Sequence, residues 1–156
     1  MPNFLIPTND TSTEMLGMIF GDDTEIFDGS AIDPAKSYMA TFVDDEGKLV
    51  AVGACDTAFG AYAGSALSLI PKAGAEDAIK DGSLSKPMVD NLYEVMNICT
   101  RLMMSEKTPH LKLAGVHEPG EAFDDLATEI VNSDQSAHLK VDVPRYGMGT
   151  VSFWVS

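Results

Sequence analysis

Residues 86–105 have the sequence KPMVDNLYEVMNICTRLMMS, and this stretch decides the fold. Its apolar side chains recur at spacings of 3, 4, 3 and 4 residues, and others widen the same face. They are Val89, Leu92, Met96, Cys99 and Met103, with Val95, Ile98 and Leu102 beside them. Ser83 or Ser85 can cap the start, and Pro87 suits a first helical turn. We therefore predict a long helix from residue 86 to about 105, buried along its apolar face.

Four polar residues of this segment fall on one line. Asp90, Glu94, Asn97 and Arg101 follow one another at spacings of 4, 3 and 4, and we call these four residues the polar stripe. Residues three and four apart are neighbours on a helix surface, so the stripe is continuous. Its ordinary interpretation is a solvent-exposed face with weak charge pairs. Asn97 is informative, because asparagine inside a helix is less favourable than alanine by about 0.5 kcal/mol.

Helix and strand patterns alternate along the rest of the chain. A helix is expected over 11–20, with Thr11 and Glu14 as a capping box, and a hairpin over 38–55. The other expected elements are a bend or bulged strand at 58–65, strands at 66–70 and 111–116, helices at 75–80 and 119–132, a closing hairpin over 138–155, and a loop or irregular edge at 22–36. This order predicts a single α+β domain over residues 1–156, with an antiparallel-rich sheet packed against helices 11–20 and 86–105.

Charge limits the partners that the chain can bind. Its 156 residues include 24 Asp and Glu but only 10 Lys and Arg, which gives a net charge of −14. Few phosphates could be neutralised by such a surface, so we expect neither nucleic acid nor an anionic membrane as a partner. An acidic surface instead favours a basic or lysine-bearing face of another protein.

Metal, redox and targeting signals are weak. Cys55 and Cys99 lie in apolar stretches and favour buried free thiols, and three scattered histidines do not predict a zinc site. The N-terminus lacks a basic segment followed by an apolar run, so no signal peptide is expected. No apolar run approaches the roughly 18 residues of a membrane-spanning helix. We expect a cytoplasmic protein with no metal or cofactor of its own.

The segment Asp90-x3-Glu94-x2-Asn97 resembles the signature of the CheC/CheX/FliY family of chemotaxis phosphatases, in which a proline follows further along the chain. Here Pro119 follows Asn97 after 21 intervening residues. The chain end, with GMGTVSFWV at 147–155, is similar to the closing hairpin of that family. Length and the single motif resemble the CheX branch more than CheC, which carries a second motif helix.

Departures from the family pattern occur on both sides of Asn97. The preceding residue is usually small in the family but is Met96 here, and the fourth residue after the asparagine is often glycine but is Arg101 here. The expected helix 119–132 looks like an insertion relative to short CheX chains. Arg101 would either add a salt bridge to a docked partner or crowd it.

The resemblance implies hydrolysis of the aspartyl phosphate on a CheY-type response regulator in two-component signalling. The metal ion and the lysine of that reaction belong to the regulator. By the same resemblance Asn97 would position the attacking water, because a carboxamide both donates and accepts hydrogen bonds without charge. Glu94 would bind the lysine of the regulator, and Asp90 would support docking at the rim.

Three functions stay open at the level of sequence. The chain is a regulator phosphatase; or a non-catalytic CheX-like module that binds a response regulator or another signalling protein, which Met96 and Arg101 favour; or an unrelated α+β protein with an acidic adaptor surface. Joint exposure of Glu94 and Asn97 on a helix lying across a sheet separates the third function from the others. A homodimer is also expected, because the CheX branch dimerises and strand 150–155 is predicted to be an apolar edge.

Overall fold

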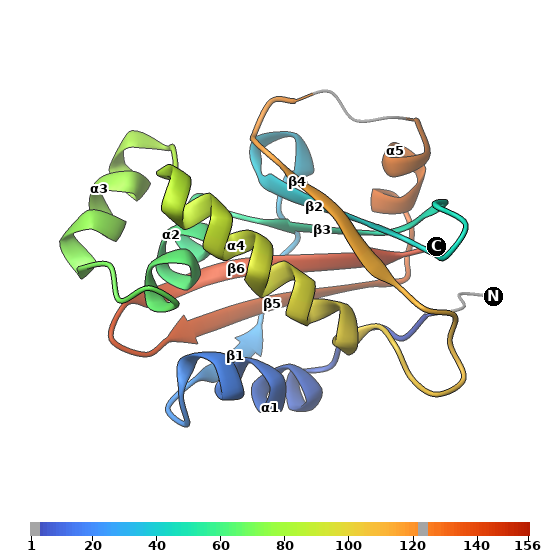
Figure 1. The fold of residues 1–156 in the computed structure, drawn as a ribbon, viewed down its shortest axis with the longest axis horizontal. Coiled ribbons are helices and arrows are strands. Elements are labelled where there is room, and N and C mark those ends of the chain that lie inside the picture. The colour runs from blue at the N-terminus through green and yellow to red at the C-terminus, as the bar shows by residue number, and fades with distance from the viewer. Residues whose placement is uncertain (1–3, 122–124) are drawn as a thin grey trace.

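An antiparallel sheet forms the centre of the fold (Figure 1). The computed structural model describes residues 4–121 and 125–156, and within them six strands pair in the order β1-β5-β6-β3-β2-β4. The strands are β1 (Glu25–Asp28), β2 (Tyr38–Val43), β3 (Leu49–Cys55), β4 (Lys112–His117), β5 (Ser136–Val143) and β6 (Gly147–Val155). Every neighbouring pair is antiparallel, which confirms the predicted α+β class.

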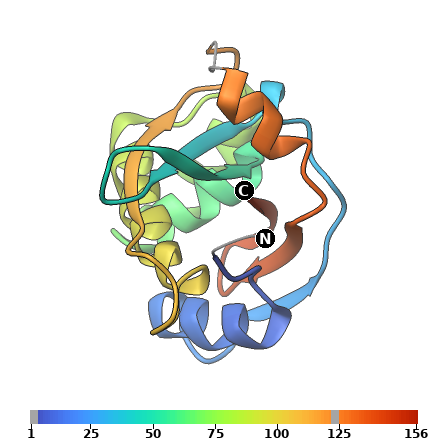
Figure 2. The same cartoon turned by 90° about the vertical axis from the view of Figure 1, so that its right-hand side faces the viewer.

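Helices cover both faces of this sheet, although unequally. They are α1 (Asn9–Phe20), α2 (Thr57–Ala66), α3 (Lys72–Asp81), α4 (Lys86–Cys99) and α5 (Asp125–Val131). Helix α4 crosses in front of the strands in Figure 1, and Figure 2 shows α5 on the other side of the sheet. The main core therefore lies between the sheet and the helices α1, α2 and α4, while α5 covers a smaller second core.

Strand side chains alternate between these two cores, as the pleat of a strand requires. Phe42 and Phe153 point into the main core with their ring centroids 6.5 Å apart, and Leu92 of α4 is buried in the same cluster. Met39 and Trp154 point the other way and join the second core beneath α5. The expected hairpins over 38–55 and 138–155 are thus confirmed.

The helix α4 buries the face that the sequence predicts but ends earlier. Its buried residues are Met88, Leu92, Val95, Met96 and Cys99. The α-helix stops at Cys99, and residues 100–102 form a 3₁₀ turn instead of continuing to 105. Thr100 Oγ1 donates a hydrogen bond to the carbonyl of Asn97 over 2.8 Å, and the N–H of Thr100 donates to the same carbonyl. A threonine that binds its own helix in this way competes with the α-helical pattern.

The segment 58–65 forms helix α2 rather than the expected bend or bulged strand. Asp56 caps this helix by accepting a hydrogen bond from the N–H of Phe59 over 2.8 Å. Gly64 lies so close to α4 that an added Cβ would stand 2.6 Å from the carbonyl oxygen of Met88. The small residues of this segment therefore serve a close helix–helix contact. The expected strand at 66–70 is wrong, because Ala66 ends α2 and residues 67–69 form a turn in which Leu69 has a φ of 54°.

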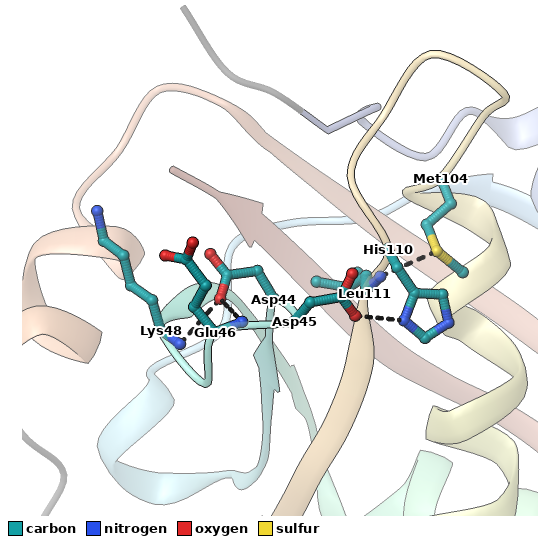
Figure 3. Close-up of polar contacts among 7 residues, drawn as sticks. All are labelled: Asp44, Asp45, Glu46, Lys48, Met104, His110 and Leu111. Carbon is teal, nitrogen blue, oxygen red and sulfur yellow. Dashed lines mark hydrogen bonds and ion pairs between the residues drawn. The ribbon is translucent and has the colours of Figure 1, made fainter.

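Side chains organise the turn between β2 and β3 (Figure 3). Asp44 Oδ1 accepts hydrogen bonds from the N–H groups of Glu46 and Lys48 over 2.9 and 3.0 Å. Asp45 Oδ1 lies 3.3 Å from Nδ1 of His110, which joins the hairpin to the loop that precedes β4. An aspartate that binds the backbone of its own turn is a common device for closing a hairpin.

The first helix starts earlier than expected. Helix α1 begins at Asn9 and not at Thr11, because the Thr8 side chain accepts from the N–H of Thr11 and the Thr11 side chain accepts from the N–H of Thr8. Glu14 takes no part in this capping box. Residues 22–36, expected as a loop or an irregular edge, contain the short edge strand β1, which pairs with β5.

The C-terminal half differs in the third helix and in the place of the last strand. The helix expected over 119–132 is confirmed only as α5, Asp125–Val131, and Pro119 lies in a turn before it. Residues 122–124 of the expected helix lie outside the described residues. Strand β6 is not an edge, because it pairs with both β5 and β3. The edge-strand argument for a homodimer is therefore wrong.

Candidate functional site

The outer surface of α4 carries three residues of the polar stripe together. Asp90, Glu94 and Asn97 are all exposed, while Leu92 and Met96 on the opposite side of the helix are buried. The helix itself lies across the face of the sheet (Figure 1). The three side chains therefore form a solvent-facing ridge that is open to a partner protein.

Two contacts hold α4 in this orientation. The N–H of Leu84, just before the helix, donates to the hydroxyl of Tyr38 on β2 over 2.9 Å in the buried interior. The Asn91 Nδ2 group donates to the carbonyl of Gly64 and to the hydroxyl of Ser68, each over 2.7 Å. These bonds tie α4 to the sheet and to α2. Asn91 is a second asparagine inside the helix, and the propensity argument applied to Asn97 could have found this anchor.

The polar groups on the ridge differ in how they are engaged. Lys86 Nζ lies 3.2 Å from Asp90 Oδ2, with the two side chains 86% and 62% exposed. An exposed pair of this kind contributes about 0–1 kcal/mol. The side chains of Glu94 and Asn97 have no hydrogen-bond or ion-pair partner within residues 4–121 and 125–156. The carboxamide of Asn97 is thus free to hold a water molecule and the Glu94 carboxylate is free to pair with a cation.

The residues that depart from the family pattern occupy different surroundings. Met96 is 1% exposed and packs in the main core, so its size does not affect the outer side of the ridge. Arg101 is exposed and lies in the 3₁₀ turn after α4. It lines a hollow of about 270 Å³ together with Glu14 and Met18 of α1. Because the α-helix ends at Cys99, Arg101 does not continue the helical line of the stripe.

Neither the thiols nor the acidic residues form a reactive or metal-binding site in the described part of the chain. Burial raises the pKa of Cys99 to about 12 and raises that of Cys55 well above its usual value, so both thiols stay protonated. Both cysteines are free and buried, as the sequence predicts. In the described part of the chain, no three or more His, Cys, Asp or Glu side chains are grouped as metal ligands. None of the described helices has the length and apolar character needed to cross a bilayer.

Several solved structures have this arrangement of helices and strands. The crystal structure of the FliM–SpeE complex from H. pylori matches with a TM-score of 0.61 at 7% identity, over 94% of this chain and 80% of the other. The CheX–CheY–BeF3–Mg²⁺ complex from Borrelia burgdorferi matches with a TM-score of 0.56 at 13% identity, over 94% and 93%. FliY from Thermotoga maritima matches with a TM-score of 0.51 at 13% identity, over 95% and 89%.

These similarities establish the fold, which is that of the CheC/CheX/FliY group. A scan against protein-family models gave no match, and a search of curated protein sequences gave none either. The fold is shared by proteins of different kinds, so the activity of this chain must be argued from its own side chains.

Proposed function

We propose that this chain accelerates hydrolysis of the aspartyl phosphate on a CheY-type response regulator, as a member of the CheX branch. The observation that carries the proposal is the joint exposure of Glu94 and Asn97, without partners among the described residues, on the outer side of α4. The similarity to a structure of CheX in complex with CheY supports it. The proposed partner acts in the cytoplasm, so the proposal also places this chain there.

The proposed roles follow from the chemistry of each side chain. An acyl phosphate in the regulator already has its metal ion and lysine, so the helper protein adds a positioned water and affinity. The Asn97 carboxamide holds that water without repelling the phosphoryl oxygens. The Glu94 carboxylate pairs with the lysine of the regulator. Asp90 contacts the partner from the start of the ridge, and Arg101 contacts it from the 3₁₀ turn that follows α4.

A second candidate is a module that binds a regulator or another signalling protein without catalysis. The exposed Arg101 beside the ridge favours it, as does the similarity to the FliM–SpeE complex. In this case Asn97 would contribute to affinity and not to rate.

We also propose that the chain forms a homodimer through a surface other than β6. Light scattering that gives twice the mass of one chain would support this proposal.

The test is dephosphorylation of a panel of phosphorylated regulators from the same organism. Asn97→Ala should lower the acceleration about 100-fold, which corresponds to roughly 3 kcal/mol of transition-state stabilisation. Asn132→Ala is the matched control, because Asn132 is exposed after α5, away from α4. Full acceleration by Asn97→Ala would overturn the assigned site. A wild-type protein that binds a regulator without any acceleration, but gains activity on Arg101→Gly, would identify the second candidate.

A further inference from the structure

The sheet face opposite α4 carries a pocket of about 550 Å³. It lies between α5, the β2–β3 hairpin and the residues that follow β4. Its apolar wall consists mainly of Met39, Val43, Leu49 and Leu126. Pockets of roughly 300–1,000 Å³ with apolar walls and a few converging polar groups are typical of small-molecule sites. The α4 ridge takes no part in this pocket, so a ligand here would be independent of the function proposed above.

A chain of hydrogen bonds lines one side of the pocket. Thr41 Oγ1 lies 3.2 Å from Nε2 of His117, and Nδ1 of His117 lies 3.2 Å from Oε2 of Glu121. A carboxylate can only accept, so Nδ1 of the imidazole carries the hydrogen. In the neutral ring Nε2 is then an acceptor, and the Thr41 hydroxyl must donate to it. Thr41 thus orients the imidazole ring, and the ring in turn orients the carboxylate of Glu121.

Charge around the pocket favours a cationic ligand over an anionic one. Glu118 and Glu121 contribute two carboxylates to the lining, whereas Lys48 contributes one ammonium group. In Figure 3 the Lys48 side chain extends away from Asp45 and His110. The whole chain has a net charge of −14, which attracts cations and repels anions over longer distances.

We propose that this pocket binds a small molecule that combines an apolar body with one protonated primary amine. The apolar body packs against Met39, Val43, Leu49 and Leu126. The ammonium group pairs with the carboxylate of Glu121, and the hydrogen bonds from Thr41 to His117 and from His117 to Glu121 hold that carboxylate in place. An amine matches the hydrogen-bond acceptor, the negative charge and the apolar wall of the pocket. It supplies hydrogen-bond donors, a positive charge and a stem that can carry an apolar group.

The experiment compares two probes with the same apolar body and opposite charge, 4-phenylbutylamine and 4-phenylbutanoate, by calorimetry and by amide chemical shifts. The amine should bind saturably, with shift changes confined to β2, β4 and α5. The carboxylate should bind at least about tenfold more weakly. No saturable binding of the amine, or equal or tighter binding of the carboxylate, would overturn the proposal.

Single substitutions then locate the amine. Glu121→Gln should weaken binding of 4-phenylbutylamine about fivefold or more, since it removes the charged acceptor for the ammonium group. Thr41→Val should weaken binding less, since Thr41 acts only through the hydrogen bond that orients His117. Glu129→Gln is the matched control, because Glu129 is exposed on α5 and does not line the pocket. Glu118→Gln, in an exposed turn where folding is not at risk, should weaken binding less than Glu121→Gln. Equal affinity of Glu121→Gln and wild type, or equal loss in Glu129→Gln, would refute the assignment.

Discussion

Replacing Gly64 by alanine should destabilise the protein, whereas the same replacement at Gly17 should stabilise it. Both glycines lie inside helices, Gly64 in α2 and Gly17 in α1. A Cβ at Gly64 would stand 2.6 Å from the carbonyl oxygen of Met88 and 3.0 Å from its Cα. A Cβ at Gly17 would meet nothing within 4 Å. The pair isolates the effect of the α2–α4 contact from the effect of helix propensity.

The expected magnitude follows from two opposing effects. Alanine inside a helix is more favourable than glycine by about 1 kcal/mol, and Gly17→Ala should gain most of this. At Gly64 the obstacle is backbone, so ordinary contact at 3.4 Å requires α4 to move by about 0.8 Å from the 2.6 Å separation. Overpacking of this kind costs about 3 kcal/mol at the upper end of its usual range. The net loss at Gly64 should be about 2 kcal/mol.

Urea unfolding followed by circular dichroism measures both variants. The side-chain amide signals of Asn91 provide a second measurement, because this group donates to the carbonyl of Gly64 and should shift when α2 and α4 separate. If Gly64→Ala is as stable as wild type, or if its change has the same sign as that of Gly17→Ala, the close contact does not exist. The account of why small residues fill α2 would then be wrong.

Three further predictions concern the ridge, one histidine and the thiols. Glu94→Ala should weaken binding of a phosphorylated regulator, and the difference from wild type should shrink as salt rises, because screening reduces charge pairing; a titration at low and high salt measures this. Burial lowers the pKa of His138 from its usual 6.5, so the unfolded chain takes up this proton at higher pH than the folded protein. The contribution of His138 to the unfolding free energy should therefore be fully present above pH 6.5 and should be lost as the pH falls through the lower pKa of the folded state. In urea titrations at several pH values, His138→Gln should remove the part of the decline that is due to His138. Cys55 and Cys99 should react with a thiol reagent only in denaturant, because both are buried and protonated; rapid labelling of the native protein would contradict their burial.

The sequence predicts those parts of the fold whose signal is local. The apolar spacing of residues 86–99 predicts both the helix α4 and its buried face, and the alternation over 38–55 and 138–155 predicts two hairpins. The exposure of Glu94 and Asn97 on one ridge follows from the same spacing, since a helix places residues three apart on one side. The proposed roles of Glu94 and Asn97 come from the resemblance of their motif to that of a known family. Helix propensity alone would not suggest these roles.

Contacts between distant segments could not be predicted from local pattern. Helix α2 is buried on most sides, so its small residues show no helical periodicity, and its conformation depends on the sheet and α4 around it. Strand β6 is interior to the sheet because β3, far earlier in the sequence, pairs with the side of β6 that does not pair with β5. Thr41 and His117 are 76 residues apart and meet only because β2 and β4 are neighbours. The sequence by itself thus determined the helix that carries the ridge, and tertiary packing alone decided the pocket behind the sheet, because its walls come from segments that no local periodicity connects.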